Sequence, residues 1–189
     1  MKKVVIVGAG ISGLFIANLF KKNSNLQVTI YEKDDVIEKN KGYGIQLSVN
    51  SVKYLNEIGF DDYAKHEKFY PKRIDFYSKD KIKLCDLEIS KFNLENCKYT
   101  TMKRSVLINF LKKGVEENIK TGINISKIDY IESKIKLTFG NEEKTECDYL
   151  ILADGVFSKS KSLLLNSQVK PKYNNTIAIR GMLNKFPKY

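Results

Sequence analysis

The chain has 189 residues and a net charge of +11 at pH 7, with 42% hydrophobic and 29% charged residues. This composition excludes a mainly disordered chain, a collagen-like repeat and a small disulfide-stapled scaffold, and the length suffices to bury a hydrophobic core. Only three of the 33 cationic residues are arginines, and the lysines are scattered. The charge therefore favours a solvated lysine-rich surface over a nucleic-acid-binding face.

Cysteine and histidine usage indicates neither a metal site nor a disulfide framework. Cys85, Cys97 and Cys147 are an odd number without a C-x-x-C pair, and His66 is the only histidine. Such cysteines are typical of a reducing compartment. No apolar stretch approaches the length of a membrane span. We therefore expect a cytoplasmic chain without a transmembrane segment or a metal.

The chain begins with the pattern of a βαβ unit. Val4–Val7 is a continuous run of β-branched residues, as in a strand that is buried on both faces. Ile11–Lys22 follows with helical periodicity, and Gln27–Tyr31 reads as a second strand that ends at Glu32. About 30 residues of this form predict two parallel strands joined by a helix.

The elements expected after this unit are of mixed type, and they follow from alternation, helical periodicity and turn residues. In chain order they are a glycine-bearing loop at 42–44, an extended piece over 44–47, a helix over about 49–58, a short helix over 61–67, antiparallel strands over 73–78 and 81–87, an amphipathic helix over 105–117, a hairpin over 123–131 and 133–139, strands over 144–147 and 149–153, and a last strand over 177–183. This mixture predicts two interleaved layers rather than a plain doubly wound domain.

The turn after the first strand carries the sequence G-x-G-x-x-G at residues 8–13. In this pattern Gly8 permits a tight turn, Gly10 lets the backbone approach a pyrophosphate, and Gly13 lets the helix pack closely on the sheet. The helix N-terminus favours an anion. Glu32 at the end of the second strand can accept hydrogen bonds from ribose hydroxyls. The alternative is a glycine-rich turn that binds no ligand.

Further segments occur in a fixed order with this turn. They are Gly44–Asn50 followed by Leu55 and Ile58–Gly59, then Met102–Leu107, then Cys147–Ser158, and finally Arg180–Gly181. With the glycine turn, they make the chain resemble the amino-terminal half of the flavoprotein aromatic hydroxylases. These are single-component FAD-dependent monooxygenases that include the para-hydroxybenzoate, salicylate, kynurenine and ubiquinone-pathway hydroxylases.

The resemblance implies an FAD site. The cofactor-binding residues that it implies are Gly8, Gly10, Ser12, Gly13, Glu32, Lys33, Ser48, Arg104, Asp154 and Gly155. The glycine turn would hold the pyrophosphate, and Glu32 with Lys33 the adenosine. Ser48 would lie near the flavin or its phosphates, and Arg104 would pair with a phosphate or the ribityl region. Asp154 would belong to the same network, which in the family also serves NAD(P)H.

Each of the isolated site residues has a simpler alternative. Arg104 could be a surface cation at a helix start, although a basic residue at that end opposes the helix dipole and is better explained by an anionic ligand. Asp154 and Gly155 could form an ordinary turn after a strand. Arg180 could be a solvated strand cation.

The resemblance also implies the fold and the domain order. We expect an α/β, Rossmann-like FAD/NAD(P)-binding fold with antiparallel β insertions, whose carboxy-terminal half is missing. Residues 1–70 would form the FAD-binding βαβ part, 71–102 part of the substrate-domain strands, 103–170 a return to the FAD-binding domain, and 171–189 the start of a truncated substrate-domain sheet. The family's later G-D motif does not occur, so a complementing second half-chain is an expected partner.

For function, the resemblance implies the FAD-binding portion of an NAD(P)H-dependent flavin monooxygenase. NAD(P)H would reduce the flavin, O₂ would form a flavin hydroperoxide, and an aromatic or quinone-like small molecule would be hydroxylated. No residue of the chain is assigned a catalytic role, and we expect the chain alone to be inactive. The alternatives are a non-catalytic or degenerate flavin- or nucleotide-binding module and, more remotely, a lysine-rich nucleic-acid binder.

Overall fold

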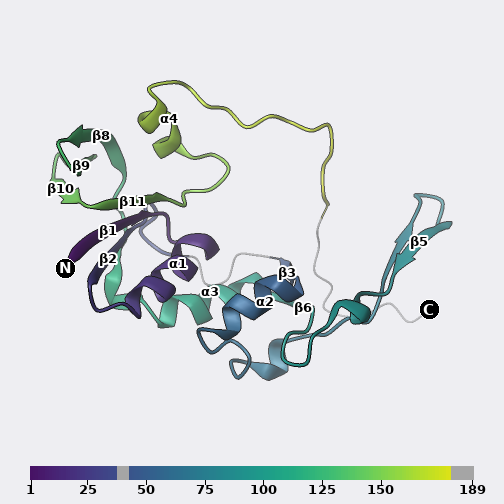
Figure 1. The fold of residues 1–189 in the computed structure, drawn as a ribbon. Coiled ribbons are helices and arrows are strands. Elements are labelled where there is room, and N and C mark those ends of the chain that lie inside the picture. The colour runs from purple at the N-terminus through teal and green to yellow at the C-terminus, as the bar shows by residue number, and fades with distance from the viewer. Residues whose placement is uncertain (38–42, 180–189) are drawn as a thin grey trace. The chain divides into compact units, whose positions relative to one another are not determined.

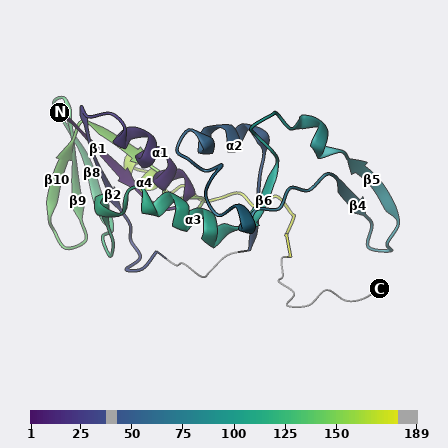
Figure 2. The ribbon, with the colours of Figure 1, turned by 90° about the horizontal axis from the view of Figure 1, so that it is seen from below.

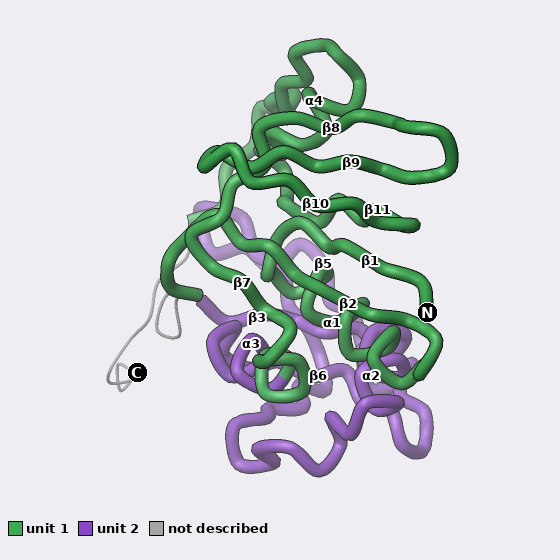
Figure 3. The backbone as a smooth tube through the Cα atoms, turned by 90° about the vertical axis from the view of Figure 1, so that its left-hand side faces the viewer, with its two compact units in different colours: residues 1–39, 111–181 green, residues 40–110, 182–189 purple. Residues whose placement is uncertain are grey.

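The computed structural model describes residues 1–37 and 43–179, and the chain divides into two compact units (Figure 3). Unit 1 comprises residues 1–39 and 111–181, and unit 2 comprises residues 40–110 and 182–189. The four-segment domain order expected from the sequence stays a prediction.

Unit 1 is built on a four-stranded parallel sheet with the order β11-β1-β2-β7. Figure 1 labels β11, β1 and β2, and Figure 3 also labels β7. Its strands are β1 (Lys2–Val7), β2 (Leu26–Tyr31), β7 (Ile119–Lys120) and β11 (Tyr149–Leu152). Helix α1 (Ile11–Lys21) connects β1 to β2. The predicted βαβ unit is thereby confirmed. The strand predicted late in the chain is also present and pairs directly with β1. It was expected to be buried, but its residues are exposed or only partly buried, because β11 is the edge strand of the sheet.

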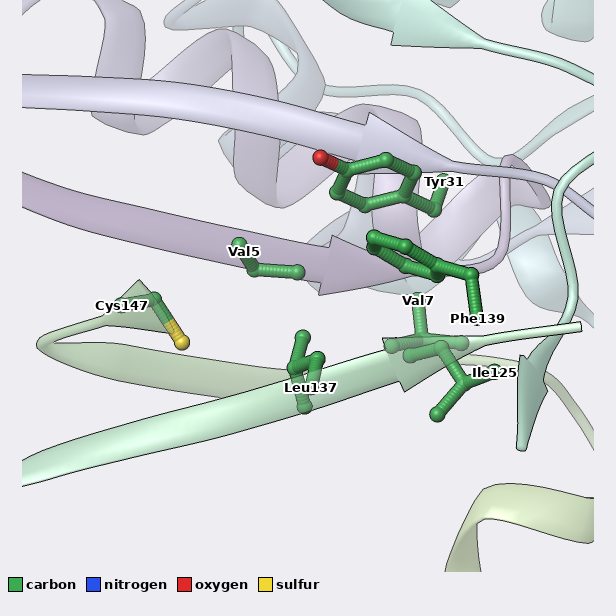
Figure 4. Packing of buried hydrophobic residues seen from close by; sticks show 7 residues of the cluster. All are labelled: Val5, Val7, Tyr31, Ile125, Leu137, Phe139 and Cys147. Carbon is green, nitrogen blue, oxygen red and sulfur yellow. The ribbon is translucent and has the colours of Figure 1, made fainter. Parts of the chain in front are cut away.

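An antiparallel sheet covers one face of this parallel sheet. It has the order β10-β9-β8 and consists of β8 (Ile125–Ile131), β9 (Lys134–Phe139) and β10 (Lys144–Cys147), which lie across β1 and β2 from α1 (Figure 2). The buried residues between the two sheets are Val5, Val7, Tyr31, Ile125, Leu137, Phe139 and Cys147 (Figure 4). The rings of Tyr31 and Phe139 lie 4.5 Å apart between centroids, so aromatic packing joins the layers.

The opposite face of the parallel sheet packs against α1. Leu14 and Ala17 of α1 are fully buried there, as the helical spacing of apolar residues predicts. Asn18 fixes the carboxy-terminal part of α3 (Arg104–Lys113) against α1, because its Nδ2 donates to the backbone oxygens of Leu14, at 2.8 Å, and Leu111, at 2.7 Å. This helix layer positions the N-terminus of α1 at the end of β1.

Unit 2 contains two short antiparallel pairs and the larger part of α3. Its other elements are β3 (Gly44–Leu47), α2 (Val49–Asn56), η1 (Lys65–Glu67), β4 (Ile74–Tyr77), β5 (Lys83–Leu87), η2 (Ile89–Phe92) and β6 (Thr100–Lys103). Strand β3 pairs with β6, and β4 pairs with β5 in a hairpin. The prediction of antiparallel strands over 73–78 and 81–87 is confirmed in shortened form.

Several predicted elements differ from the structure. The helix expected over 61–67 is reduced to the single 3₁₀ turn η1, and the helix expected over 105–117 ends at Lys113 and continues as a separate turn, η3 (Glu116–Asn118). Residues 177–179 are not in a strand, and the rest of the strand expected over 177–183 lies outside the described residues. Strand β6 and helix α4 (Lys159–Leu165) were not predicted at all.

The chain passes from the antiparallel sheet to the parallel sheet at Asp148, between β10 and β11. This carboxylate is 8% exposed and accepts the backbone N–H of Lys3 at 2.7 Å. It also accepts the ammonium of Lys134, at 2.6 Å, and that of Lys2, at 3.2 Å. These contacts, with Lys134 contributing most, hold the pKa of Asp148 well below its ordinary value near 4.

We expect the stabilisation from Asp148 to be lost in acid. Because its pKa is lower in the folded chain than in the unfolded chain, the contribution is fully present well above pH 4 and declines as the pH falls below that value. Thermal midpoints of the parent chain and of Asp148→Asn should therefore differ most near pH 7 and converge below about pH 4. Asp129→Asn, which removes only an exposed pair with Lys127, should change the midpoint little at any pH. A constant gap for Asp148→Asn down to pH 3 would contradict this assignment.

Candidate dinucleotide-binding site

Packing within the protein requires glycine at two positions of the turn after β1. Gly8 has φ = +100°, and a Cβ there would lie 2.6 Å from the backbone oxygen of Ala153. A Cβ on Gly13 would lie only 2.0 Å from the backbone oxygen of Gly8. The tight turn and the close helix approach predicted for these two glycines are therefore confirmed.

Gly10 differs from both, because the protein gives no reason for a glycine there. Its φ of −76° suits any residue, and a Cβ would meet no atom within 4 Å. Gly10 is the N-cap of α1, no side chain caps this helix, and its first turn carries no acidic residue. An uncapped N-terminus beside an unhindered backbone suits an anionic group. The turn thus fits the pyrophosphate of a dinucleotide. Ser12, the other residue predicted in this turn, is exposed.

Glu32 holds the turn through hydrogen bonds to backbone groups. One carboxylate oxygen accepts the N–H of Ala9 at 2.7 Å, and the other accepts the N–H of Asp34 at 3.1 Å. Each carboxylate oxygen has a second lone pair, so hydrogen bonds to ribose hydroxyls remain possible. Its neighbour Lys33 is exposed. The structural role of Glu32 was not predicted, because the spacing of the motif does not show which backbone groups lack partners.

The loop after β11 is held by the start of α4. Asp154 Oδ1 accepts the hydroxyl of Ser158 at 2.6 Å, and its Oδ2 accepts the N–H of Ser160 at 3.1 Å. Ser158 in turn caps α4 by accepting the N–H of Lys161 at 3.0 Å. Gly155 has φ = +83°, which favours glycine. Ser158 ends the segment Cys147–Ser158 that the sequence analysis singled out. Its role in holding the loop and capping α4 was not predicted, although a serine before a helix is a known capping signal.

Three of the predicted segments meet in unit 1. Gly8, Glu32 and Asp154 follow β1, β2 and β11, which are neighbours in the parallel sheet. Contacts join them directly, because Glu32 binds the turn at Ala9 and Gly8 lies against Ala153. Ligands of open α/β sheets bind at the carboxyl ends of the strands. This end of the sheet is therefore the candidate dinucleotide site.

Unit 2 holds the two other predicted residues, Ser48 and Arg104, at opposite ends of β3. Ser48 is the exposed N-cap of α2, and its hydroxyl contacts Asn50 and the Ser51 hydroxyl. Arg104 starts α3, and its backbone N–H donates to the oxygen of Tyr43 at 3.0 Å. Its exposed guanidinium makes no hydrogen bond or ion pair within residues 1–37 and 43–179. Their roles toward a cofactor stay predictions, and Arg180 with Gly181 lies outside the described residues.

The described residues hold no group of three or more His, Cys, Asp or Glu that could bind a metal ion. No helix among them is both long and apolar enough to cross a membrane. All three cysteines are free, with Cys85 exposed on β5 and the others buried. Burial, and next the charge of Asp148, raises the pKa of the Cys147 thiol to about 11. Cys147 is thus an unreactive core residue at neutral pH.

Comparison with known proteins identifies the family of the chain. Residues 2–176 match the family model described as pyridine nucleotide-disulphide oxidoreductase. The chain is 26% identical to 6-hydroxynicotinate 3-monooxygenase of Bordetella bronchiseptica, over 95% of the chain and 47% of that protein. It is 24% identical to salicylate hydroxylase of Pseudomonas putida, over 96% of the chain and 43% of that protein. The crystal structure of CtdE in complex with FAD and a substrate aligns with a TM-score of 0.78 at 17% identity, covering 92% of this chain and 42% of that one.

These matches also limit what transfers to this chain. It spans less than half the length of the curated relatives it matches. The likeness to CtdE shows the fold, because the identity is low. The disulphide in the family description has no counterpart here, since all three cysteines are free. Three findings point to the same family, namely the α/β fold with a parallel sheet, the glycine turn and the extent of the match. The chain belongs to the pyridine nucleotide-disulphide oxidoreductase family and corresponds to the amino-terminal part of its FAD-dependent monooxygenase relatives.

Proposed function

We propose that the chain is the FAD-binding portion of an NAD(P)H-dependent flavin monooxygenase. The observation that carries this proposal is the meeting of three segments at the carboxyl ends of β1, β2 and β11. There, Gly10 leaves the backbone unhindered beside the uncapped N-terminus of α1, Glu32 offers acceptors, and Asp154 is fixed by α4.

The residues of the site fit FAD as follows. The N–H groups at the start of α1, beside Gly10, would bind the pyrophosphate, and Glu32 would bind the adenosine ribose. Asp154 and Gly155 would adjoin the same site, and Ser48 and Arg104 would contact phosphates or the flavin side. When bound, FAD would supply redox chemistry, being reduced by NAD(P)H and using O₂ for oxygen transfer. The protein would supply placement and exclusion of water.

The substrate class is part of the same proposal. The two curated relatives are named for 6-hydroxynicotinate and salicylate, both small aromatic acids. We therefore propose an aromatic or quinone-like small molecule as the substrate. The proposed reaction is its hydroxylation by the route given in the sequence analysis, with NAD(P)H as the reductant and O₂ as the source of the oxygen atom. The three free cysteines agree with a cytoplasmic location.

A covering second half is proposed because apolar side chains remain exposed in unit 2. The hairpin β4–β5 has one face formed by Ile74, Phe76, Cys85 and Leu87, which are opposed in register. Phe76 and Leu87 are 46% and 44% exposed. A two-stranded hairpin is marginally stable without a partner layer. The missing half of the relatives' length would supply such a layer.

The purified 189-residue chain should bind FAD weakly and should not oxidise NAD(P)H. This follows because the glycine turn and Glu32 can bind the adenosine and pyrophosphate, whereas the second half would complete the flavin-ring site. Flavin fluorescence during an FAD titration and NAD(P)H absorbance at 340 nm would measure both. Tight stoichiometric binding with steady NAD(P)H oxidation would overturn the need for a second half. Binding without turnover, even with a complementing half added, would instead favour a non-catalytic flavin-binding module.

A further inference from the structure

The apolar pattern of β11 does not determine how it aligns with β1. All four of its residues, Tyr-Leu-Ile-Leu at 149–152, are apolar or aromatic, as in strands that are covered on both faces. Strand register is normally fixed by alternation of apolar and polar residues, because a slip by one residue would move the apolar set to the other face. The residues of β11 show no such alternation. A shift by one residue would move the chain by about 3.3 Å. Another feature must therefore select the observed register, in which Val4 lies opposite Tyr149 and Val7 opposite Leu152.

Asp148 supplies a specific contact at the first position of this pair. Its backbone N–H donates to the Lys3 oxygen at 2.9 Å, while its side-chain Oδ2 accepts the Lys3 N–H at 2.7 Å. Both polar backbone groups of Lys3 are thus bound by one residue. A shift by one residue would place Cys147 or Tyr149 opposite Lys3, and neither has a carboxylate that could accept this N–H.

The far end of the same strand reaches the candidate site. The Ala153 N–H donates to the Val7 oxygen at 2.8 Å, and the Ala153 oxygen lies where a Cβ on Gly8 would be. Asp154 follows immediately. The register of β11 therefore determines which residue lies against the glycine turn.

We propose that Asp148 is a positioning residue that fixes the register of β11 on β1 and thereby holds Asp154 beside the glycine turn. Its ion pairs with Lys2 and Lys134 stabilise the junction between the two sheets, whereas its contact with the Lys3 N–H selects the register. The expected effect on FAD binding rests on the proposed function, whereas the expected effect on the register of β11 does not.

The test separates these two contacts with matched variants. Asp148→Ala removes the acceptor of the Lys3 N–H together with both ion pairs. Asp148→Glu keeps the charge for the lysines but moves the carboxylate away from the Lys3 N–H. Lys134→Met removes the shortest ion pair and leaves the Lys3 contact. Amide hydrogen exchange at Ala153, compared with amides in β8 and β9, reports the register without any cofactor.

In Asp148→Ala and Asp148→Glu, exchange at Ala153 should accelerate at least about 10-fold more than exchange in β8 and β9, and FAD affinity should fall about 10-fold. Lys134→Met should lower the thermal midpoint with no selective change at Ala153. If Asp148→Ala fails to fold, the comparison of Asp148→Glu with Lys134→Met decides. Equal acceleration at all sites in the aspartate variants would overturn the positioning role. A parent chain that does not bind FAD would refute the proposed function and leave the exchange result intact.

Discussion

Replacing Gly13 with alanine should lower the thermal midpoint by about 6–12 °C. The new Cβ would lie 2.0 Å from the Gly8 oxygen and 3.3 Å from Ile6 Cγ2, so backbone atoms rather than a flexible side chain must move. Overpacking of this kind costs about 3 kcal/mol, and for a chain of this size each kcal/mol shifts the midpoint by about 2–4 °C. Thermal unfolding followed by circular dichroism measures the effect.

The matched control for this variant is Gly10→Ala in the same turn. No atom lies within 4 Å of the added Cβ, so the cost is limited to the N-cap preference, about 1 kcal/mol or less. Alanine at position 13 would gain up to about 1 kcal/mol of helix propensity if the neighbouring backbone could yield. A midpoint for Gly13→Ala at or above that of the parent would therefore show that α1 does not pack on the sheet as closely as the structure has it.

Two strands of the parallel sheet could be predicted from the sequence because their residues are uniformly apolar. Val4–Val7 and residues 149–153 are such runs, although only Val4–Val7 is fully buried. Strand β6 was missed because it is short and mostly polar, with the sequence Thr-Thr-Met-Lys, and because its pairing with β3 is a tertiary effect. Helix α4 was missed because serines and lysines weaken its helical pattern.

The candidate site could be predicted where each segment is contiguous and follows a strand. The glycine turn, Glu32 and Asp154 have this form, and the parallel sheet brings them together. The contacts that hold them could not be predicted, since the Lys3–Asp148 bond joins residues 145 positions apart in the chain. Glu32 was predicted as a ligand-binding group, and its bond to the Ala9 N–H could not be read from the motif. Sequence patterns thus identify the groups that meet a ligand better than the groups that support them.

Gly10→Val should reduce FAD affinity about 100-fold or more while the fold survives. The valine side chain would occupy the space beside the uncapped start of α1, where the proposed site brings the pyrophosphate close to the backbone. A 100-fold loss corresponds to about 2.7 kcal/mol. The fold should lose only about 1 kcal/mol, because valine is a poor N-cap but its Cβ would meet no atom within 4 Å.

This variant tests the cofactor site more cleanly than Glu32→Ala. Removing the Glu32 carboxylate would leave the N–H groups of Ala9 and Asp34 without their acceptor, so a loss of FAD binding could arise from a distorted turn. Glu32→Gln retains one acceptor oxygen and serves as the milder comparison. Titration of FAD into each variant, with a thermal scan of the same samples, separates the two effects. Unchanged FAD affinity in a folded Gly10→Val chain would show that the pyrophosphate does not bind at this turn, because no other position in the turn leaves the backbone so unhindered.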